Sequence, residues 1–91
     1  MAELSGLMLG QYYLGELIGR GGMASVYRAR QASMDRDVAV KVMSAALSHN
    51  AEFVARFERE ARVIARLQRP HILPVIDFGR SDEHIYLVMR Y

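Results

Sequence analysis

The sequence predicts an α+β fold in which one long helix packs on a five-stranded antiparallel sheet. Five short segments are rich in β-branched and aromatic residues, and one longer segment carries apolar residues at helical spacing. Glycine-rich or polar stretches separate these segments, as turns and loops require. The predicted order along the chain is three strands, the helix and two further strands.

The first three strands are predicted at residues 12–18, 25–30 and 37–43. The glycines of residues 19–22 join the first two strands into a hairpin, and residues 33–36 form a polar turn before the third. Side chains alternate along a strand, so the third strand has two different faces. One face carries Val38, Val40 and Val42, and the other carries Ala39, Lys41 and Met43.

The helix is predicted from about Ala51 to Gln68, with Ser48 and Asn50 as candidate N-terminal caps. Pro70 is expected to stop it, because proline lacks the amide hydrogen that a helix interior needs. Two more strands are predicted at residues 72–78 and 84–90. The turn residues 79–82 lie between them.

Length and composition restrict the class of protein. A chain of 91 residues forms a modest core, which buries roughly 60% of the surface that the unfolded chain exposes. The absence of cysteine excludes disulfides and cysteine-ligated metals and fits a reducing cytoplasm. The N-terminus lacks a secretory-signal pattern, and no apolar run approaches the ~18 residues of a membrane span. We therefore expect a cytoplasmic protein.

The glycine-rich segment between the first two strands is a candidate phosphate-binding loop, because glycines let backbone amides approach phosphate oxygens. A dinucleotide-binding motif would continue into a helix, and a P-loop would end in Gly-Lys-Ser or Gly-Lys-Thr. Here Val26 and Tyr27 continue the chain as a strand. The two remaining interpretations are a strand–loop–strand clamp over phosphates and an ordinary hairpin turn.

Lys41 and Glu60 form a second candidate constellation. Lys41 is the only lysine among twelve basic residues, and it lies in an otherwise apolar strand. A lysine there is costly unless an acidic group pairs with it or its amine reaches water. Glu60 occupies a gap in the apolar helix stripe, whose other members are Phe53, Phe57, Ile64 and Leu67. We therefore expect a Lys41–Glu60 ion pair.

These features together resemble the N-terminal lobe of Hanks-type bacterial serine/threonine protein kinases. The resemblance covers about residues 12–91 and rests on three elements in order: Gly19-Arg20-Gly21-Gly22-Met23-Ala24-Ser25-Val26, Val38-Ala39-Val40-Lys41 and Phe57-Glu58-Arg59-Glu60-Ala61. Each motif is weak alone, but their order and spacing are specific. The resemblance implies an N-terminal extension at residues 1–11 and a kinase N-lobe at residues 12–91 that ends at the hinge.

The resemblance also implies which residues bind ATP. The loop would cover the phosphates, and Lys41 would contact the α- and β-phosphates while pairing with Glu60. Val26 and Ala39 would pack on adenine, Met89 would be the gatekeeper, and the backbone of Arg90 and Tyr91 would meet the adenine edge. The full set is Ile18, Gly19, Arg20, Gly21, Gly22, Met23, Ala24, Ser25, Val26, Ala39, Lys41, Met89, Arg90 and Tyr91. Ile64 and Val75 would belong to an apolar stack between helix and sheet.

The chain departs from the family pattern in two places and contains one misleading motif. Ala24 replaces the third glycine of the loop, and Arg90 stands where the hinge is usually acidic. Asp77-Phe78-Gly79 spells the family's magnesium-binding tripeptide. It precedes the hinge, so we interpret it as the end of the fourth strand and its turn.

The family's His-Arg-Asp catalytic loop, its magnesium ligands and its helical C-lobe have no counterpart in these residues. We expect ATP as ligand, with Mg²⁺ and protein substrates bound by a longer parent. That parent could be membrane-anchored. The chain alone is expected to be inactive and prone to self-association through exposed apolar surface.

Two rival interpretations remain. The chain could be a non-catalytic, kinase-like interaction module. A nucleic-acid binder is less favoured, because the net charge is only +2 and glutamates interleave with the arginines. Its candidate residues are Arg56, Arg59, Arg62, Arg66 and Arg69.

Overall fold

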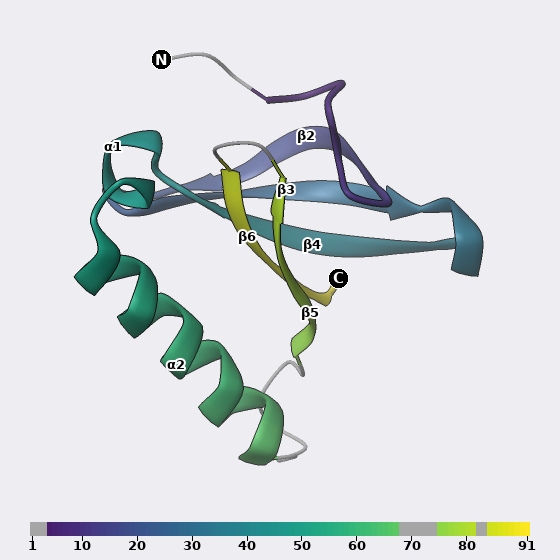
Figure 1. The fold of residues 1–91 in the computed structure, drawn as a ribbon. Coiled ribbons are helices and arrows are strands. Elements are labelled where there is room, and N and C mark those ends of the chain that lie inside the picture. Colours follow the sequence, from purple (N-terminus) through teal and green to yellow (C-terminus); the bar gives the residue numbers. More distant parts are fainter. Residues whose placement is uncertain (1–3, 68–74, 82–83) are drawn as a thin grey trace.

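The computed structural model describes residues 4–67, 75–81 and 84–91. They form a six-stranded antiparallel sheet with one long helix beside it (Figure 1). The strands are β1 (Met8–Leu9), β2 (Tyr12–Arg20), β3 (Ala24–Gln31), β4 (Arg36–Met43), β5 (Val75–Ser81) and β6 (His84–Arg90). Their order across the sheet is β1-β2-β3-β4-β6-β5. The predicted α+β class is confirmed, with one strand more than expected.

The additional strand, β1, comes from the segment before Tyr12. Leu9 of β1 is buried, and Leu4 packs against the same core cluster. Two turn glycines with positive φ, Gly6 and Gly10, lie close to this strand. This segment therefore forms part of the folded sheet and its core.

The sheet curls strongly, so that its two sides meet around the core. The Tyr12 hydroxyl on β2 donates a hydrogen bond of 2.8 Å to an Asp77 carboxylate oxygen on β5, although β3, β4 and β6 lie between these strands in the sheet. The rings of Tyr12 and Tyr86 also meet edge to face, with centroids 6.2 Å apart. Only a curled sheet allows these contacts.

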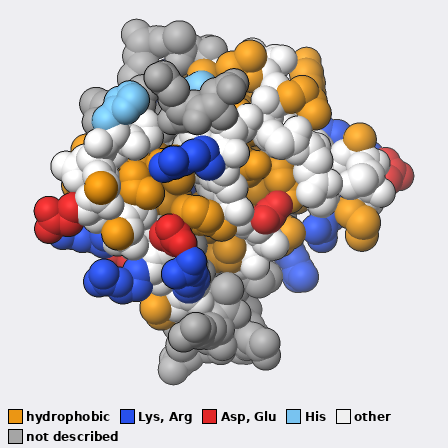
Figure 2. Space-filling view, viewed as in Figure 1, with side chains coloured by type: hydrophobic (Ala, Val, Ile, Leu, Met, Phe, Trp, Pro, Cys, Tyr) orange, Lys and Arg blue, Asp and Glu red, His pale blue; other side chains and the backbone are white. Residues whose placement is uncertain are grey.

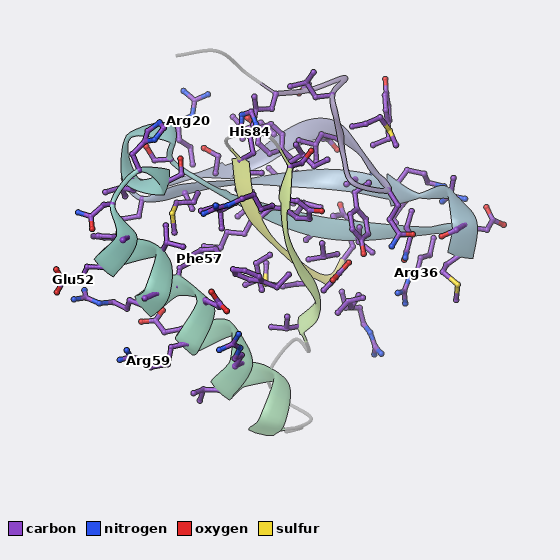
Figure 3. All side chains as sticks on the ribbon, in the orientation of Figure 1. Arg20, Arg36, Glu52, Phe57, Arg59 and His84 are labelled. Carbon is purple, nitrogen blue, oxygen red and sulfur yellow. The ribbon has the colours of Figure 1, made fainter. Side chains whose placement is uncertain are left out.

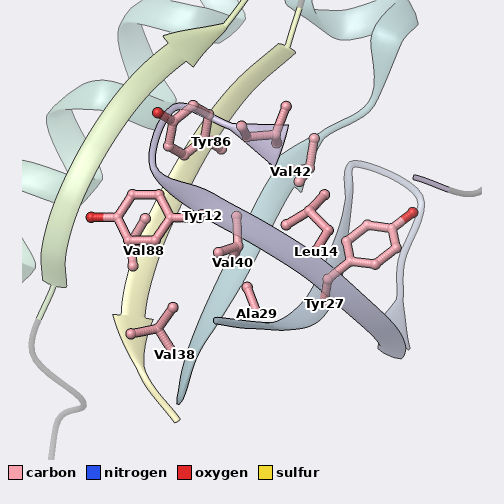
Figure 4. Packing of buried hydrophobic residues seen from close by; sticks show 10 residues of the cluster. Tyr12, Leu14, Tyr27, Ala29, Val38, Val40, Val42, Tyr86 and Val88 are labelled. Atoms are coloured by element: carbon pink, nitrogen blue, oxygen red, sulfur yellow. The ribbon is translucent and has the colours of Figure 1, made fainter. Parts of the chain in front are cut away.

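The core lies on the concave face of this sheet (Figure 4). The predicted alternation of β4 is confirmed there, because Val38, Val40 and Val42 all belong to the buried cluster. The remaining buried members are Leu9, Tyr12, Leu14, Tyr27, Ala29, Tyr86 and Val88. The opposite face of β4 carries Ala39, Lys41 and Met43, of which Ala39 and Met43 are also buried and Lys41 is half-buried.

The predicted long helix is α2 (Ala51–Leu67). Its N-terminus is capped by Asn50, whose side-chain oxygen accepts a hydrogen bond of 3.1 Å from the Phe53 amide. A short helix that the sequence did not predict, α1 (Ala45–Ser48), precedes it, and a 3₁₀ turn, η1 (Ala32–Met34), lies between β3 and β4. Pro70, the expected stop, lies outside the described residues.

Strand β5 corrects one predicted turn. Gly79, Arg80 and Ser81 continue the strand instead of leaving it. A Cβ added to Gly79 would lie 2.6 Å from the Tyr86 hydroxyl oxygen and 2.7 Å from the ring carbon that bears it. The glycine therefore makes room for a neighbouring aromatic ring. The first part of the strand predicted at residues 72–78 lies outside the described residues.

None of the helices in the described part of the chain is both long and apolar enough to cross a membrane.

Candidate functional site

A cavity of about 440 Å³ lies where the β2–β3 hairpin, strands β4 and β6, and helix α2 meet. Its lining residues are Gly19, Arg20, Gly21, Gly22, Met23, Ala24, Val26, Lys41, Phe57, Glu60 and Leu87. Figure 2 shows hydrophobic side chains in the middle of the face that Figure 1 presents, with acidic and basic groups beside them. The fold thus brings the glycine loop, the strand lysine and the helical glutamate to one cavity, as the sequence predicts.

Strand register explains the sheet side of this cavity. Lys41 on β4 is paired with Val26 on β3 and with Leu87 on β6. Paired residues in an antiparallel sheet point to the same face, so Lys41 has an apolar neighbour on each side. Its side chain is half-buried. The lone lysine is therefore held away from bulk water on the face opposite to the core.

Two predicted adenine contacts share this face of the sheet. Ala39 lies two residues before Lys41, and it is paired with Met89 on β6. Ala39 is buried and Met89 is half-buried. Neither lines the cavity itself, but the face that carries Lys41 continues through them towards the C-terminal end of β6.

Helix α2 contributes Phe57 and Glu60, which are three residues apart and therefore lie on one helix face. Glu60 is exposed and lines the same cavity as Lys41. However, the ion pairs among the described residues do not join Glu60 to Lys41. The predicted Lys41–Glu60 ion pair is thus not formed here, because the helix stands at a position where the two side chains share a cavity without meeting.

The glycine loop connects β2 to β3 and is held by two backbone hydrogen bonds. The Gly21 amide donates to the Ala24 carbonyl at 2.9 Å, and the Ser44 amide after β4 donates to the Met23 carbonyl at 2.8 Å. Two-residue hairpin turns of types I′ and II′ need positive φ, but the positive-φ glycines among the described residues are Gly6 and Gly10. The loop is therefore not a type I′ or II′ turn, whereas longer hairpin loops built on a type I turn do not need positive φ.

Packing does not require the loop glycines either. A Cβ added to Gly22 would meet no atom within 4 Å, and one added to Gly21 would make an ordinary contact of 3.6 Å with the Ala24 carbonyl oxygen. Neither backbone strain nor crowding inside the chain therefore explains these two glycines. A ligand that approaches the backbone closely would explain them.

The chain end after β6 is held by a charged cluster on β3 and β4. The Arg28 guanidinium lies over the Tyr91 ring, 4.8 Å from its centroid, and donates to Asp37 at 2.7 Å. Arg30 also donates to Asp37, at 2.9 Å. Hydrogen bonds from Arg28 and then Arg30 lower the pKa of Asp37 below its ordinary value. The cluster fixes Tyr91, a predicted hinge residue, beside β3.

Several predicted site residues do not line the cavity. They are Ile18, Ser25, Ala39, Met89, Arg90 and Tyr91. Ser25 is paired with Arg20 and Val42, so it lies on the other face of β3 from Val26. The side chain of Ile64 lies outside the described residues, and Val75 of the predicted apolar stack is half-buried in β5.

The cavity is also lined by two residues that the sequence did not predict as part of the site, Phe57 and Leu87. The sequence carries a signal for each. Phe57 precedes Glu60 by three residues on the same helix face. Leu87 could be found only from the pairing of β6 with β4, which requires knowledge of the sheet order.

Comparison with known proteins places this chain in a family. The family model described as "Protein kinase domain" matches residues 12–91. Serine/threonine-protein kinase PknE of Mycobacterium bovis is 47% identical over 85 residues, which are 93% of this chain and 15% of that protein. Serine/threonine-protein kinase PrkC of Bacillus subtilis is 40% identical over 82 residues, which are 90% of this chain and 13% of the relative.

The fold comparison agrees. The crystal structure of a double mutant of the Mycobacterium tuberculosis PknI kinase domain matches with a TM-score of 0.84 and 37% identity, and the match covers 100% of this chain and 36% of that one. The chain thus spans a small part of the curated relatives and about a third of a solved kinase domain. From the family match, the sequence identity and the shared fold together, this chain belongs to the protein kinase family and corresponds to the N-terminal part of the kinase domain.

Proposed function

We propose that this chain is the ATP-binding lobe of a protein serine/threonine kinase, and that its cavity receives the nucleotide phosphates. The observation that carries the proposal is the pairing of a glycine loop with a half-buried lysine across one cavity. Neither positive φ nor crowding by the described residues explains Gly21 and Gly22, and the lysine has no acidic partner among the described ion pairs. A polyanion would account for both.

The chemistry of the site follows from these groups. The backbone amides of the loop can donate hydrogen bonds to phosphate oxygens, which glycine allows to come close. Lys41 supplies a compact ammonium, and its apolar neighbours Val26 and Leu87 lower the local dielectric and strengthen its attraction to an anion. Glu60 faces the same cavity and would orient the ammonium once the helix comes closer.

The adenine end of the nucleotide would extend along the same sheet face. Ala39 and Met89 are cross-strand neighbours there, and they offer an apolar surface. The backbone of Arg90 and Tyr91 follows directly, and the Arg28–Tyr91 contact holds it beside β3. In this assignment Arg90 meets adenine through its backbone, so its unusual charge leaves the contact intact.

ATP supplies the phosphoryl group, and the protein contributes positioning and charge stabilisation. We propose that a longer protein containing this lobe transfers the γ-phosphoryl group of ATP to serine or threonine residues of proteins. The activity is assigned to that longer protein because this chain spans only 15% of PknE and 36% of the solved PknI domain. Within its described residues, no group of three or more His, Cys, Asp or Glu is gathered for a metal. We therefore assign no magnesium ligand here. The lack of cysteine supports a cytoplasmic setting for this lobe.

Titration with a fluorescent ATP analogue tests the proposal. We compare the chain with a Lys41→Met variant, which keeps the apolar stem of the side chain and removes the ammonium. We expect the affinity to fall at least about tenfold, which corresponds to about 1.4 kcal/mol of binding free energy. An Arg80→Met variant is the matched control, because Arg80 is an exposed cation that does not line the cavity.

The control decides what a loss of affinity means. Equal losses in both variants would indicate general attraction of an anion to a basic surface and would contradict the proposal. Unchanged affinity in Lys41→Met would also contradict it, and would favour the alternative of a kinase-like interaction module that does not use the lysine.

A further inference from the structure

The tripeptide Asp77-Phe78-Gly79 in strand β5 has no role in the proposed nucleotide site, although its letters match a kinase motif found elsewhere in the family. Its side chains lie on both sides of the strand. Asp77 reaches the concave core, where it meets Tyr12, and Phe78 reaches the helix side, where it meets Phe57. The tripeptide therefore connects the core of the sheet to helix α2.

Asp77 attaches β5 to the opposite side of the curled sheet. One carboxylate oxygen accepts the Tyr12 hydroxyl at 2.8 Å, and the other accepts the Phe78 amide at 2.8 Å. Burial, and then the hydrogen bond to Asp77, raise the pKa of the Tyr12 hydroxyl to about 12. The hydroxyl thus stays a donor across the physiological range, and the position of β5 is fixed at this residue.

Phe78, the next residue of β5, contacts the helix. Its ring lies 5.9 Å from the ring of Phe57, with the two planes inclined by 46°. Strand β5 is the part of the sheet that α2 packs against most closely. Figure 3 shows Phe57 between α2 and the strands, whereas Arg59 lies on the outer side of the helix.

Helix α2 also contacts α1, which in turn contacts β6, but the described side chains of α2 make no hydrogen bond or ion pair to the described strands. The hydrogen bonds and ion pairs of its described side chains stay local, at the Asn50 cap and in the Glu58–Arg62 pair within the helix. Apolar contact is non-directional, so the volume of the touching side chains sets the spacing. Phe57 and Glu60 lie on one helix face, so this spacing also sets the distance of Glu60 from Lys41.

We propose that Phe78 is a positioning residue that sets the spacing between helix α2 and the sheet, and through it the separation of Glu60 from Lys41, while Asp77 fixes the strand that carries it. The functional importance of the Glu60–Lys41 separation rests on the proposed nucleotide site. The spacing between helix α2 and the sheet does not depend on that site, so it can be measured without nucleotide. The misleading motif thus has a structural function of its own.

Distance measurement between two spin labels tests the proposal. The chain contains no cysteine, so the substitutions Arg59→Cys on α2 and Met34→Cys in η1 provide two unique and exposed labelling sites. Pulsed electron–electron double resonance then gives the distribution of helix-to-sheet distances in the labelled chain. We expect Phe78→Leu, which keeps an apolar side chain but removes the ring, to shift or broaden this distribution.

Four further variants make the result specific. Phe57→Leu removes the other ring and should give the same change, and the double variant with Phe78→Leu should add little to it. Phe78→Tyr keeps the ring and should retain the parent distribution. Val38→Ala weakens the core away from the helix, because Val38 is fully buried in the concave cluster, and it should also leave the distances unchanged.

Two outcomes would overturn the proposal. One is a Phe78→Leu distribution that superimposes on that of the parent. The other is an equal change in Val38→Ala, because the distance would then follow stability and not the ring contact. Neither outcome depends on ATP, so failure of nucleotide binding in the separate Lys41 experiment leaves this test intact.

Discussion

Two glycines illustrate how a single residue is selected either by the fold or by something outside it. Gly79 lies against the buried ring of Tyr86, so a methyl group there would overlap the ring. Gly22 at the loop has no neighbour within 4 Å of an added Cβ. The first glycine serves packing, and the second is available for a ligand.

This difference predicts opposite effects of alanine on stability. Gly79→Ala should destabilise the chain by about 1–3 kcal/mol, because the added methyl group overpacks a rigid aromatic ring. Gly22→Ala should leave stability unchanged or raise it slightly, because it restricts only the unfolded chain. Urea unfolding of both variants measures this, and equal losses would contradict the packing argument.

Tyr12 predicts a pH dependence. Its pKa is raised from 10.0 to about 12, first by burial and then by the hydrogen bond to Asp77. The folded state therefore holds the phenolic proton more tightly than the unfolded state does. The corresponding stability is complete below pH 10, and it is lost as the pH rises through about 12.

The absorbance of tyrosinate during an alkaline titration, taken as the difference between the chain and Tyr12→Phe, gives this pKa. Asp77→Asn should move it downwards, because the negative charge that opposes ionisation is removed. A pKa of Tyr12 near 10 in the parent would contradict both the burial of the hydroxyl and its hydrogen bond to Asp77.

At the level of residues, the sequence predicts which groups share the cavity better than how they pair. The lone lysine and the glutamate in the helix stripe do line one cavity. Their predicted ion pair is not formed. The sequence could not show this, because helix periodicity predicts which face Glu60 occupies but not the distance of that face from the sheet. That distance depends on Phe57 and Phe78, which are far apart in sequence.

Elements formed by local pattern are the ones that the sequence predicts well. Strand β6 spans residues 84–90 as expected, and α2 begins at Ala51 as expected. Strand β1 is two residues long, too short to show alternation, and α1 is four residues long. The residues from Gly79 onwards predict a turn because they are turn-forming types, whereas the packing partner that requires Gly79, Tyr86, lies on another strand and is not visible in the local pattern.

The start of α2 provides a prediction at this scale. Asn50→Ala removes the side-chain oxygen that accepts the Phe53 amide, so it should destabilise the chain by about 0.5–2 kcal/mol. Asn50→Asp keeps an acceptor in the same place, and its negative charge interacts favourably with the positive end of the helix dipole, so this variant should retain stability. Thermal unfolding followed by circular dichroism compares them. Equal losses in the two variants would contradict a capping role.

The whole molecule exposes large apolar side chains around its site. Ile18 and Met23 of the hairpin and Tyr91 at the end of the chain are 45%, 54% and 56% exposed. Apolar groups gathered on an exposed surface favour association.

We therefore expect sedimentation velocity to show reversible association of the chain at increasing concentration. Met23→Ser should weaken this association, because it removes an apolar group at the hairpin tip. Met34→Ser, at an equally exposed position in η1, should not. A single monomeric species at all concentrations would contradict the expectation.

The proposed phosphate site consists of the glycine loop and Lys41. Amide chemical shifts of the ¹⁵N-labelled chain, recorded during titration with ATP, show which of these groups the phosphates approach. We expect the largest changes at residues 21–26 and at Lys41. Changes that gather instead on the outer face of α2, at Arg59 and Arg62, and leave the loop amides unmoved would contradict the proposed phosphate site.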